Sequence, residues 1–386
     1  MIFPLLPLFL STLPGAPAAA LGWIEGVAET TASFVKIASG RRADRAGRRK
    51  PLVVAGYGLS SAVRPLVSLA TSWTAVLGLR FLDRVGKGVR SAPRDALIAR
   101  VTPPDRRGAA YGLHRAMDNA GAVLGPLLAA ALLASGISLR GVFALSAIPA
   151  ALAVAVLLAV VREAPASAAA SACAAAPACA APAPSLPAPK AEAPPLPRAF
   201  WTTAGVVTLF TLSASSDAFI LLKAREVGFA AGAVPLLWAA SNAVRALLGR
   251  WGGGLSDRLG RKPLLLSAWS LYALCYAAIS RVSSPPLLVL VVLVYSLHAA
   301  LAEGAERALV ADLVPEGSRG RAFGWLHGMT GLAALPASAG FGWLWQRHGS
   351  GTAFLAGAAV AASAAIALAL LVPAHQGSDR SAPRLG

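Results

Sequence analysis

Two charged stretches of an otherwise apolar chain decide the fold: GRRADRAGRRKP at residues 40–51 and GGLSDRLGRKP at residues 253–263. The first stretch holds six cations, one acid and two glycines. Asp44 and Asp257 are 213 positions apart. Glycines flank both aspartates at the same separation: Gly40 and Gly47 in the first stretch, Gly253 and Gly260 in the second. A topogenic charge cluster would explain the cations, but not the matched glycines and aspartates.

A second pair of stretches supports a duplication. ALIARVTPPDRRGAAYG at residues 96–112 aligns with ALVADLVPEGSRGRAFG at residues 308–324 at a shift of 212, with eight of seventeen positions identical. Two unrelated motifs at nearly one offset indicate a tandem duplication of one unit. Parallel repeats related by an axis along the membrane normal are a transporter architecture, with the substrate site between the repeats.

Composition places these repeats in a membrane. Of the 386 residues, 56% are hydrophobic and only 13% are charged, and mean hydropathy is +0.63. A soluble chain carries about 25% charged residues. A net charge of +18 is also typical of nucleic-acid binding, but here the cations form short clusters between apolar segments, as in cytoplasmic loops of membrane proteins. We therefore expect no nucleic-acid partner, and the three cysteines give no disulfide or metal spacing.

Apolar segments of about 20 residues, enough to cross a bilayer, predict eleven complete helices. They cover residues 18–39, 52–70, 73–98, 109–134, 142–161, 199–222, 231–248, 264–279, 286–308, 322–343 and 352–372. The stub MIFPLLPLFL is too short to span. Repeat symmetry would start helix 1 about fourteen residues before Met1, because helix 7 begins 58 residues before Asp257. We therefore expect the natural protein to begin earlier.

The expected fold is an all-α membrane protein of two six-helix bundles related by pseudo-two-fold symmetry. Residues 1–161 form the first half, 162–198 an Ala/Pro-rich linker, 199–374 the second half and 375–386 a tail. Cations concentrate in alternate connections, after helices 2, 4, 8 and 10. Lys- and Arg-rich connections face the cytoplasm, so we expect the linker and both termini there too.

The repeated charged loops have a physical role. A glycine lets backbones approach closely, and an aspartate in a tight loop can accept hydrogen bonds from a neighbouring helix N-terminus or pair with an arginine. Such a loop can clamp one helix against another in one conformation and release it in the next. The clamping residues would be Gly40, Asp44, Arg45, Gly47, Arg48, Gly253, Asp257, Arg258, Gly260 and Arg261.

These loops share the pattern G-x-x-x-D-R-x-G-R-[RK], which resembles the signature loop of the major facilitator superfamily. RFLDRVGKG at residues 80–88 resembles the helix-4 motif of that superfamily, and GAVLGP at residues 121–126 resembles part of its antiporter motif. The second glycine pair of the antiporter motif is absent, since Ala129 and Ala130 follow Pro126. The resemblance covers essentially the whole chain and implies solute transport, without indicating which solute.

Helix 4 is the richest in charge inside a predicted span. Its face carries Arg80, Asp83, Arg84 and Lys87 at three- and four-residue steps, and the repeat maps them to the uncharged Val292, Tyr295, Ser296 and Ala299. Charge within a span indicates function, and we favour it over a structural ion-pair network. The spacing of Asp83 and Lys87 suits an ion pair. Arg90 and Arg94 lie nearer the cytoplasmic end, where snorkelling is expected.

Other ionisable residues complete the candidate pathway. Glu25 and Glu29 lie one turn apart in helix 2, and form either a proton site or silent ion pairs with helix 4. Arg64 in helix 3 is a candidate partner for a carboxylate, and Asp217 stands within helix 7.

For several other residues we expect a role in gating or packing rather than substrate contact, and those of helix 10 lie near its cytoplasmic end. In helix 10 these are Glu303, Glu306 and Arg307, and in helix 5 Gly125 and Pro126. Arg115 and Asp118 are spaced as a structural pair. His114 with Met117, and His327 with Met329, have residue types that bind copper, but interfacial packing is the better interpretation.

We therefore expect a secondary transporter, coupled to protons and moving a small organic solute, with export favoured. It would work as a monomer in a bacterial cytoplasmic (inner) membrane, in contact with lipid and without a cofactor or metal. The alternative is a transporter-like sensor or assembly partner without flux. The sequence holds no nucleotide-binding loop, no H-E-x-x-H and no G-x-S-x-G, so we do not expect an enzyme.

Overall fold

The computed structural model is helical throughout its described elements; it describes residues 9, 13, 20–46, 49–160, 195–213, 217–229 and 234–372. The first half contains α2 (Ala20–Ala46), α3 (Lys50–Leu66), α4 (Trp73–Val101), α5 (Arg107–Ala134), α6 (Leu139–Leu145) and α7 (Ala147–Val160). The second half contains α9 (Arg198–Ser213), α10 (Ala218–Glu226), α11 (Val234–Leu259), α12 (Arg261–Ile279), α13 (Pro285–Leu313) and α14 (Arg319–Leu371). Short 3₁₀ turns cover Val67–Leu69, Pro104–Arg106 and Glu316–Ser318.

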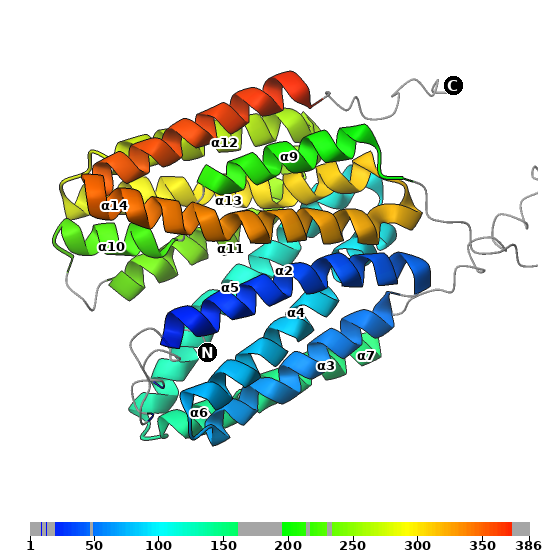
Figure 1. Cartoon of the computed structure of the whole chain (residues 1–386), viewed down its shortest axis with the longest axis vertical. Helices are drawn as coiled ribbons and strands as arrows, with labels where there is room; N and C mark the ends of the chain where they lie inside the picture. The colour runs from blue at the N-terminus through cyan, green and yellow to red at the C-terminus, as the bar shows by residue number, and fades with distance from the viewer. Residues whose placement is uncertain are drawn as a thin grey trace, which may run out of the picture.

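The helices form two bundles that lie side by side (Figure 1). Two long seams join them: α5 packs along α11, and α2 packs along α14. The two seams are equivalent under the duplication, because α2 corresponds to α11 and α5 corresponds to the first part of α14. The expected all-α fold of two related bundles is confirmed.

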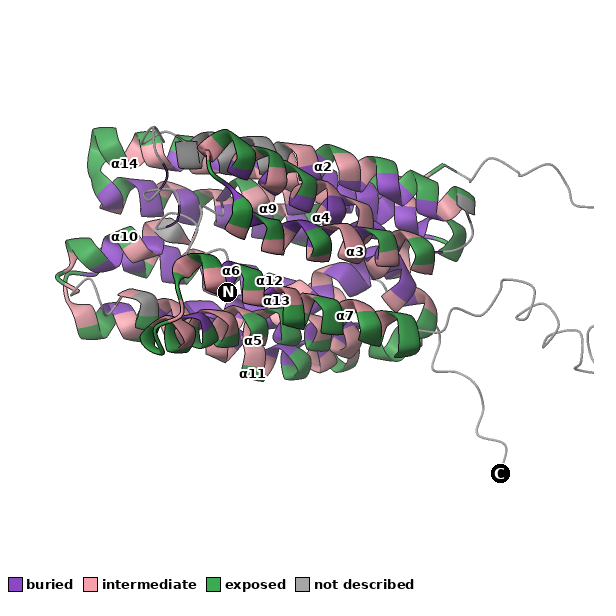
Figure 2. Cartoon of the chain, turned by 90° about the horizontal axis from the view of Figure 1, so that it is seen from below, coloured by how far each residue is buried: buried purple, intermediate pink, exposed green. Residues whose placement is uncertain are grey.

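The cores of both bundles are apolar, and so is much of their outer surface. Buried residues occupy the helix faces that turn toward other helices, and exposed residues the outer faces (Figure 2). Trp269, Tyr272 and Tyr276 are fully buried in the second half, whereas leucines such as Leu247 and Leu370 are exposed. Exposed leucines on outer helix faces are typical of lipid contact.

Six helical segments of the described chain are long and apolar enough to cross a membrane. They are Lys50–Leu69, Pro104–Ala134, Leu139–Val160, Arg261–Ile279, Pro285–Leu313 and Glu316–Leu371. The last covers two of the expected spans. The charged face of α4 keeps that helix outside this set, although it is as long as α13.

Three helix boundaries differ from expectation. Helix 6 is divided into α6 and α7 at Ser146, because Pro149 has no N–H to donate to the carbonyl of residue 145. Helix 7 is described as α9 and α10, with Asp217 just before α10. Helices 11 and 12 run together as α14, with a break at Gly349, whose φ of 84° suits glycine.

Candidate functional site

Asp257 links the two halves at the end of α11. Its carboxylate accepts hydrogen bonds from the backbone N–H groups of Gly108 (2.9 Å) and Ala109 (2.8 Å), in the first turn of α5. N–H groups in a first turn have no partner within their own helix, and the helix dipole favours a negative charge there. The carboxylate of one half therefore caps a helix of the other; the sequence predicted a cap on a neighbouring helix, and the structure places that helix in the opposite half.

Arginines reinforce this contact, which we call the Asp257 clamp. Arg261 pairs with Asp257 and lies 3.2 Å from the carboxylate of Asp312, and its Nη2 donates to the carbonyl of Pro104 at 2.8 Å. Arg107 of the first half reaches the other oxygen of Asp312 at 2.6 Å. Asp312 is thus held by one arginine from each half.

Asp44 makes the equivalent contact from the first half, which we call the Asp44 clamp. Its carboxylate accepts hydrogen bonds from the N–H groups of Gly320 (2.9 Å) and Arg321 (2.6 Å), at the start of α14. Arg49 lies 3.7 Å from the same carboxylate and donates to the carbonyl of Glu316 at 2.9 Å. Both copies of the repeated loop therefore cap a helix in the opposite half.

Glycines allow these contacts. A Cβ on Gly253 would overlap the carbonyl oxygen of Gly108, and a Cβ on Gly40 would overlap that of Gly320. Gly260 has a φ of 94° at the start of α12, a conformation that favours glycine. Arg45 and Arg258 are exposed, whereas Gly47 and Arg48 lie outside the described residues.

A buried network that the sequence analysis missed joins the halves beside the clamps. Asp95 of α4 is fully buried. Its carboxylate lies 2.7 Å from Nε2 of His327 in α14, 3.4 Å from Nε of Arg307 in α13 and 3.0 Å from Arg94. Tyr111 donates to the Asp95 carbonyl at 2.6 Å. One carboxylate thus connects three cationic or imidazole groups from both halves.

This network corrects two expectations for helix 4. Arg94 does not snorkel, because it pairs with Asp95. Arg90 does not snorkel either: its guanidinium lies over the ring of Tyr57, 4.1 Å from the centroid. Both side chains are retained by partners within the first half.

Two of the predicted gating residues of helix 10, Glu303 and Arg307, also contact the first half. Glu303 pairs with Arg115 of α5 at 3.0 Å, across the two halves. Arg115 also lies 3.4 Å from Asp118, as its spacing suggested. Glu306 is half-buried and has no hydrogen bond or ion pair to another described residue. Gly125 and Pro126 lie within α5, both half-buried.

The charged face of α4 is held within the first half. Asp83 is buried, and its two oxygens lie 2.9 Å from Nε of Arg64 and 3.5 Å from Nη1 of Arg80. The partners of Asp83 are therefore Arg64 and Arg80 rather than the expected Lys87. Arg84 and Lys87 are half-buried on the same helix.

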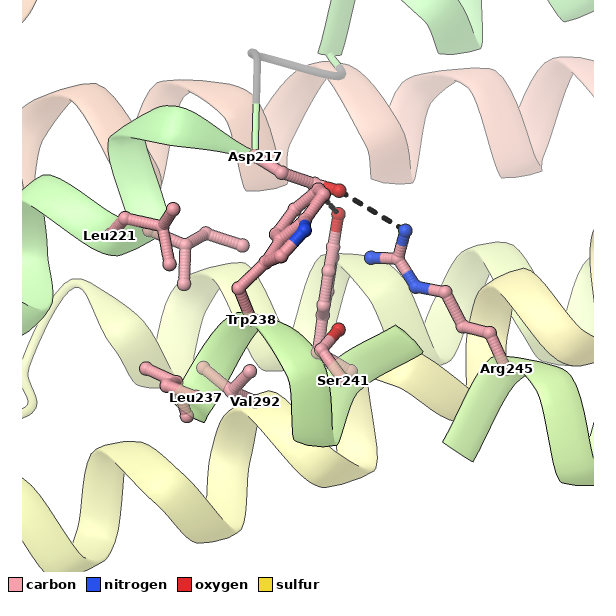
Figure 3. A pocket seen from close by; sticks show the side chains of 9 residues that line it. Asp217, Leu221, Leu237, Trp238, Ser241, Arg245 and Val292 are labelled. Carbon is pink, nitrogen blue, oxygen red and sulfur yellow. Dashed lines mark hydrogen bonds and ion pairs between the residues drawn. The ribbon is translucent and has the colours of Figure 1, made fainter. Parts of the chain in front are cut away.

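Asp217 forms a second charged site, in the second half (Figure 3). Its carboxylate accepts a hydrogen bond from Arg245 at 3.1 Å and one from the hydroxyl of Tyr295 at 2.9 Å. A small pocket beside it is lined by Trp238, Ser241 and apolar side chains of α10, α11 and α13. The side chains of Glu25 and Glu29, on α2, lie outside the described residues.

The histidine and methionine pairs have other surroundings. His327 bonds to Asp95, and His114 lies 3.6 Å from Asp118. Within the described residues, no group of three or more His, Cys, Asp or Glu side chains is placed to hold a metal ion.

Comparisons with known proteins identify the family. The family model of the Major Facilitator Superfamily matches residues 1–252 and 218–384. An MFS-type transporter of Methanocaldococcus jannaschii is 29% identical over 353 residues, covering 90% of this chain and 84% of that protein. The multidrug resistance protein MdtH of Photorhabdus laumondii is 32% identical over 161 residues, 39% of each chain. The solved structure of the proton:xylose symporter XylE has a TM-score of 0.72 at 17% identity and covers 95% of this chain and 88% of its own. The chain therefore belongs to the major facilitator superfamily and is an integral, multi-pass membrane protein of transporter type.

Proposed function

We propose that this protein is a secondary active transporter that moves a small organic solute by alternating access, coupled to protons and with export favoured. It would act as a monomer in a bacterial cytoplasmic membrane. The cation-rich ends of its helices would face the cytoplasm, as their charge bias predicts. The proposal requires two features: a seam that can open and close, and charged groups that can exchange a proton for a solute.

The observation that carries the proposal is the pair of clamps. Asp44 and Asp257 each hold a helix N-terminus of the opposite half through backbone N–H groups. Such bonds can break and reform as rigid bodies rock, without rebuilding either core. In this conformation the clamps close the cation-rich ends, so the open side would be the opposite one.

Two carboxylates inside the halves support coupling. Asp83 holds Arg64 and Arg80, and Asp217 holds Arg245. Protonation of either carboxylate would remove the charge that retains its arginine. The freed guanidinium could then bind an anionic group of the solute, so that protonation of the carboxylate and binding of the solute are coupled. Export is favoured by the partial helix-5 motif and by the similarity of part of the chain to multidrug resistance proteins.

The experiment is a flux assay in proteoliposomes, across a panel of organic anions and cations, with and without a pH gradient. We expect flux that depends on the gradient, and we expect Asp83→Asn and Asp217→Asn to abolish it while the protein remains in the membrane. Arg80→Ala should mainly raise KM. Asp105→Asn is the matched control, because that carboxylate is exposed on a connection.

A sensor or assembly partner without flux is the alternative. It would bind a solute and change the distance between the halves, but no solute would cross at any pH gradient. Flux that does not depend on the pH gradient would instead support transport and contradict proton coupling.

A further inference from the structure

A groove lies on the outer face of the α5–α11 seam beside the Asp257 clamp, and its side chains take no part in the clamps or the charged sites described above. It has a volume of about 390 Å³ and is lined by Leu247, Arg250, Trp251, Gly254, Leu255 and Arg258 of α11, with Ala109 of α5. The α11 residues recur at three- and four-residue steps and so share one face of the helix. Leu247 is 79% exposed and Trp251 63% exposed. This stripe therefore faces the surroundings of the protein rather than another helix.

Gly254 is the first indication that the groove is built for an occupant. It follows Gly252 and Gly253, which cannot carry a Cβ, because a Cβ on either would overlap backbone of α13 or α5. At Gly254 the nearest atom to an added Cβ is the methyl carbon of Ala109, 3.8 Å away. A helical glycine costs about 1 kcal/mol relative to alanine. Packing of the protein explains the first two glycines and leaves the third unexplained.

The other seam offers a direct comparison. The position equivalent to Gly254, at the offset of 213, is Arg41 of α2. Its guanidinium lies over the ring of Trp325, 5.4 Å from the centroid, and so covers the α2–α14 seam. The same place on the α5–α11 seam is left open by the glycine.

The charges of the groove indicate what fills it. Arg250 and Arg258 are exposed, and neither has a hydrogen bond or ion pair to another residue in the part of the chain that the structure describes. They lie about 12 Å apart along the helix, a span that two extended arginines can bridge. Arginine binds phosphate through paired N–H groups, and tryptophan anchors at the level of lipid head groups.

We propose that this groove binds the phosphate head group of an anionic phospholipid, from the leaflet at the cation-rich end of the helices. Arg250 and Arg258 would hold the phosphate, Trp251 and Leu255 between them would pack against the head-group region, and Leu247, about one turn farther into the membrane, would contact the acyl chains. Ala109 belongs to the opposite half, so the complete groove exists only while the α5–α11 seam is closed. A lipid bound there therefore stabilises the closed seam.

The test is native mass spectrometry of the purified, delipidated protein. It is titrated with phosphatidylglycerol or with phosphatidylcholine of the same acyl chains. We expect the wild type to retain phosphatidylglycerol about tenfold more strongly, because both lipids carry the phosphate but the two arginines repel the choline cation of phosphatidylcholine. Arg250→Gln should remove this preference. Gly254→Leu should remove it too, because an added Cβ meets no atom nearer than 3.8 Å and the longer side chain would occupy the groove.

Two controls and one competitor make the result decisive. Arg106→Gln removes an exposed cation of a nearby connection, and Gly205→Leu fills open space beside an exposed helical glycine of α9; both should retain lipid as the wild type does. Equal retention of the two lipids, or unchanged retention in Gly254→Leu, would overturn the proposal. So would displacement of the lipid by millimolar inorganic phosphate, which would indicate a site for free anions. If Arg250→Gln fails to fold, Gly254→Leu alone decides.

Discussion

The Asp44 and Asp257 clamps are copies of one loop, but their side-chain pairs differ. Both aspartates bind two backbone N–H groups at the start of a helix. In the Asp257 clamp, Arg107 and Arg261 also share Asp312. At the Asp44 clamp, the residue equivalent to Arg107 is Arg319, which donates to the carbonyl oxygens of Ala311 and Ala99 at 3.2 and 3.3 Å.

The position equivalent to Asp312 is Arg100, so the charge is reversed there. Arg100 lies 3.1 Å from Glu316, whose side chain is 55% exposed. A carboxylate shared by two arginines binds more strongly than neutral carbonyls or an exposed ion pair. Both copies of the loop retain the aspartate that caps a helix, while the ion pairs around that aspartate differ. We therefore expect the Asp257 clamp to be the stronger of the two.

The largest effect is expected from Asp95, the most buried of the described acids that join the two halves. Asp95, like Asp312, is bound by arginines from both halves, but it is fully buried whereas the Asp312 side chain is 13% exposed. Removing one partner of a buried pair costs about 3–5 kcal/mol. Asp95→Asn should therefore lower the melting temperature in detergent more than Asp312→Asn does. His327→Gln should have a smaller effect than either, because glutamine can still donate a hydrogen bond to Asp95 and no carboxylate is lost. A larger fall in the melting temperature of Asp312→Asn than of Asp95→Asn would contradict this order.

The next effect tests how closely the α5–α11 seam packs. Gly253→Ala should open that seam, because the new methyl group would overlap the carbonyl oxygen of Gly108. Overpacking costs about 1–3 kcal/mol, so the ratio of closed to open protein should fall about 5- to 150-fold. The distance between spin labels at Asp105 in the first half and Leu259 in the second half measures how far the seam opens. Gly254→Ala is the control and should leave the distance unchanged.

The clamps and the buried network show what the sequence could predict. The offset between Asp44 and Asp257, with glycines around both, was enough to predict two loops that cap a neighbouring helix or pair with an arginine, but not that the capped helix belongs to the opposite half. Asp95 was missed because its partner His327 is 232 positions away, and because neighbouring Arg94 resembled a snorkelling side chain. The signal was present: at the offset of 212, Asp95 maps onto Arg307, and opposite charges at equivalent positions can pair across a symmetry axis.

Helix 4 marks another limit of the sequence. The spacing of Asp83 and Lys87 suited an ion pair, but Arg64 of α3 and Arg80 lie closer to Asp83. Competition among several cations for one acid depends on how the helices pack, which local spacing does not determine. The breaks near Ser146 and Gly349 had visible causes, a proline and a glycine, but apolar runs alone hid them.

A smaller effect distinguishes the two helix caps directly. Asp257→Asn and Asp44→Asn each weaken a charge-assisted cap worth about 1.5–3 kcal/mol. Asp257→Asn should open its seam further, because it also removes a partner of Arg261, which is shared with Asp312, whereas the position equivalent to Asp312 is the cation Arg100. Spin-label distances across each seam give the comparison. Equal opening in the two variants would show that the caps, and not the arginines, set the strength of the clamps.

The smallest effect is expected at the reversed pair of the Asp44 clamp. Arg100→Gln removes an ion pair whose acid, Glu316, is more than half exposed. Exposed pairs contribute about 0–1 kcal/mol, and salt screens them. The α2–α14 distance should therefore change little, and the change should vanish at high salt. Asp312→Asn, at the equivalent position, should open the α5–α11 seam and remain effective at high salt, because its arginines are largely buried. Equal, salt-sensitive effects at both positions would mean that the charge reversal does not distinguish the clamps.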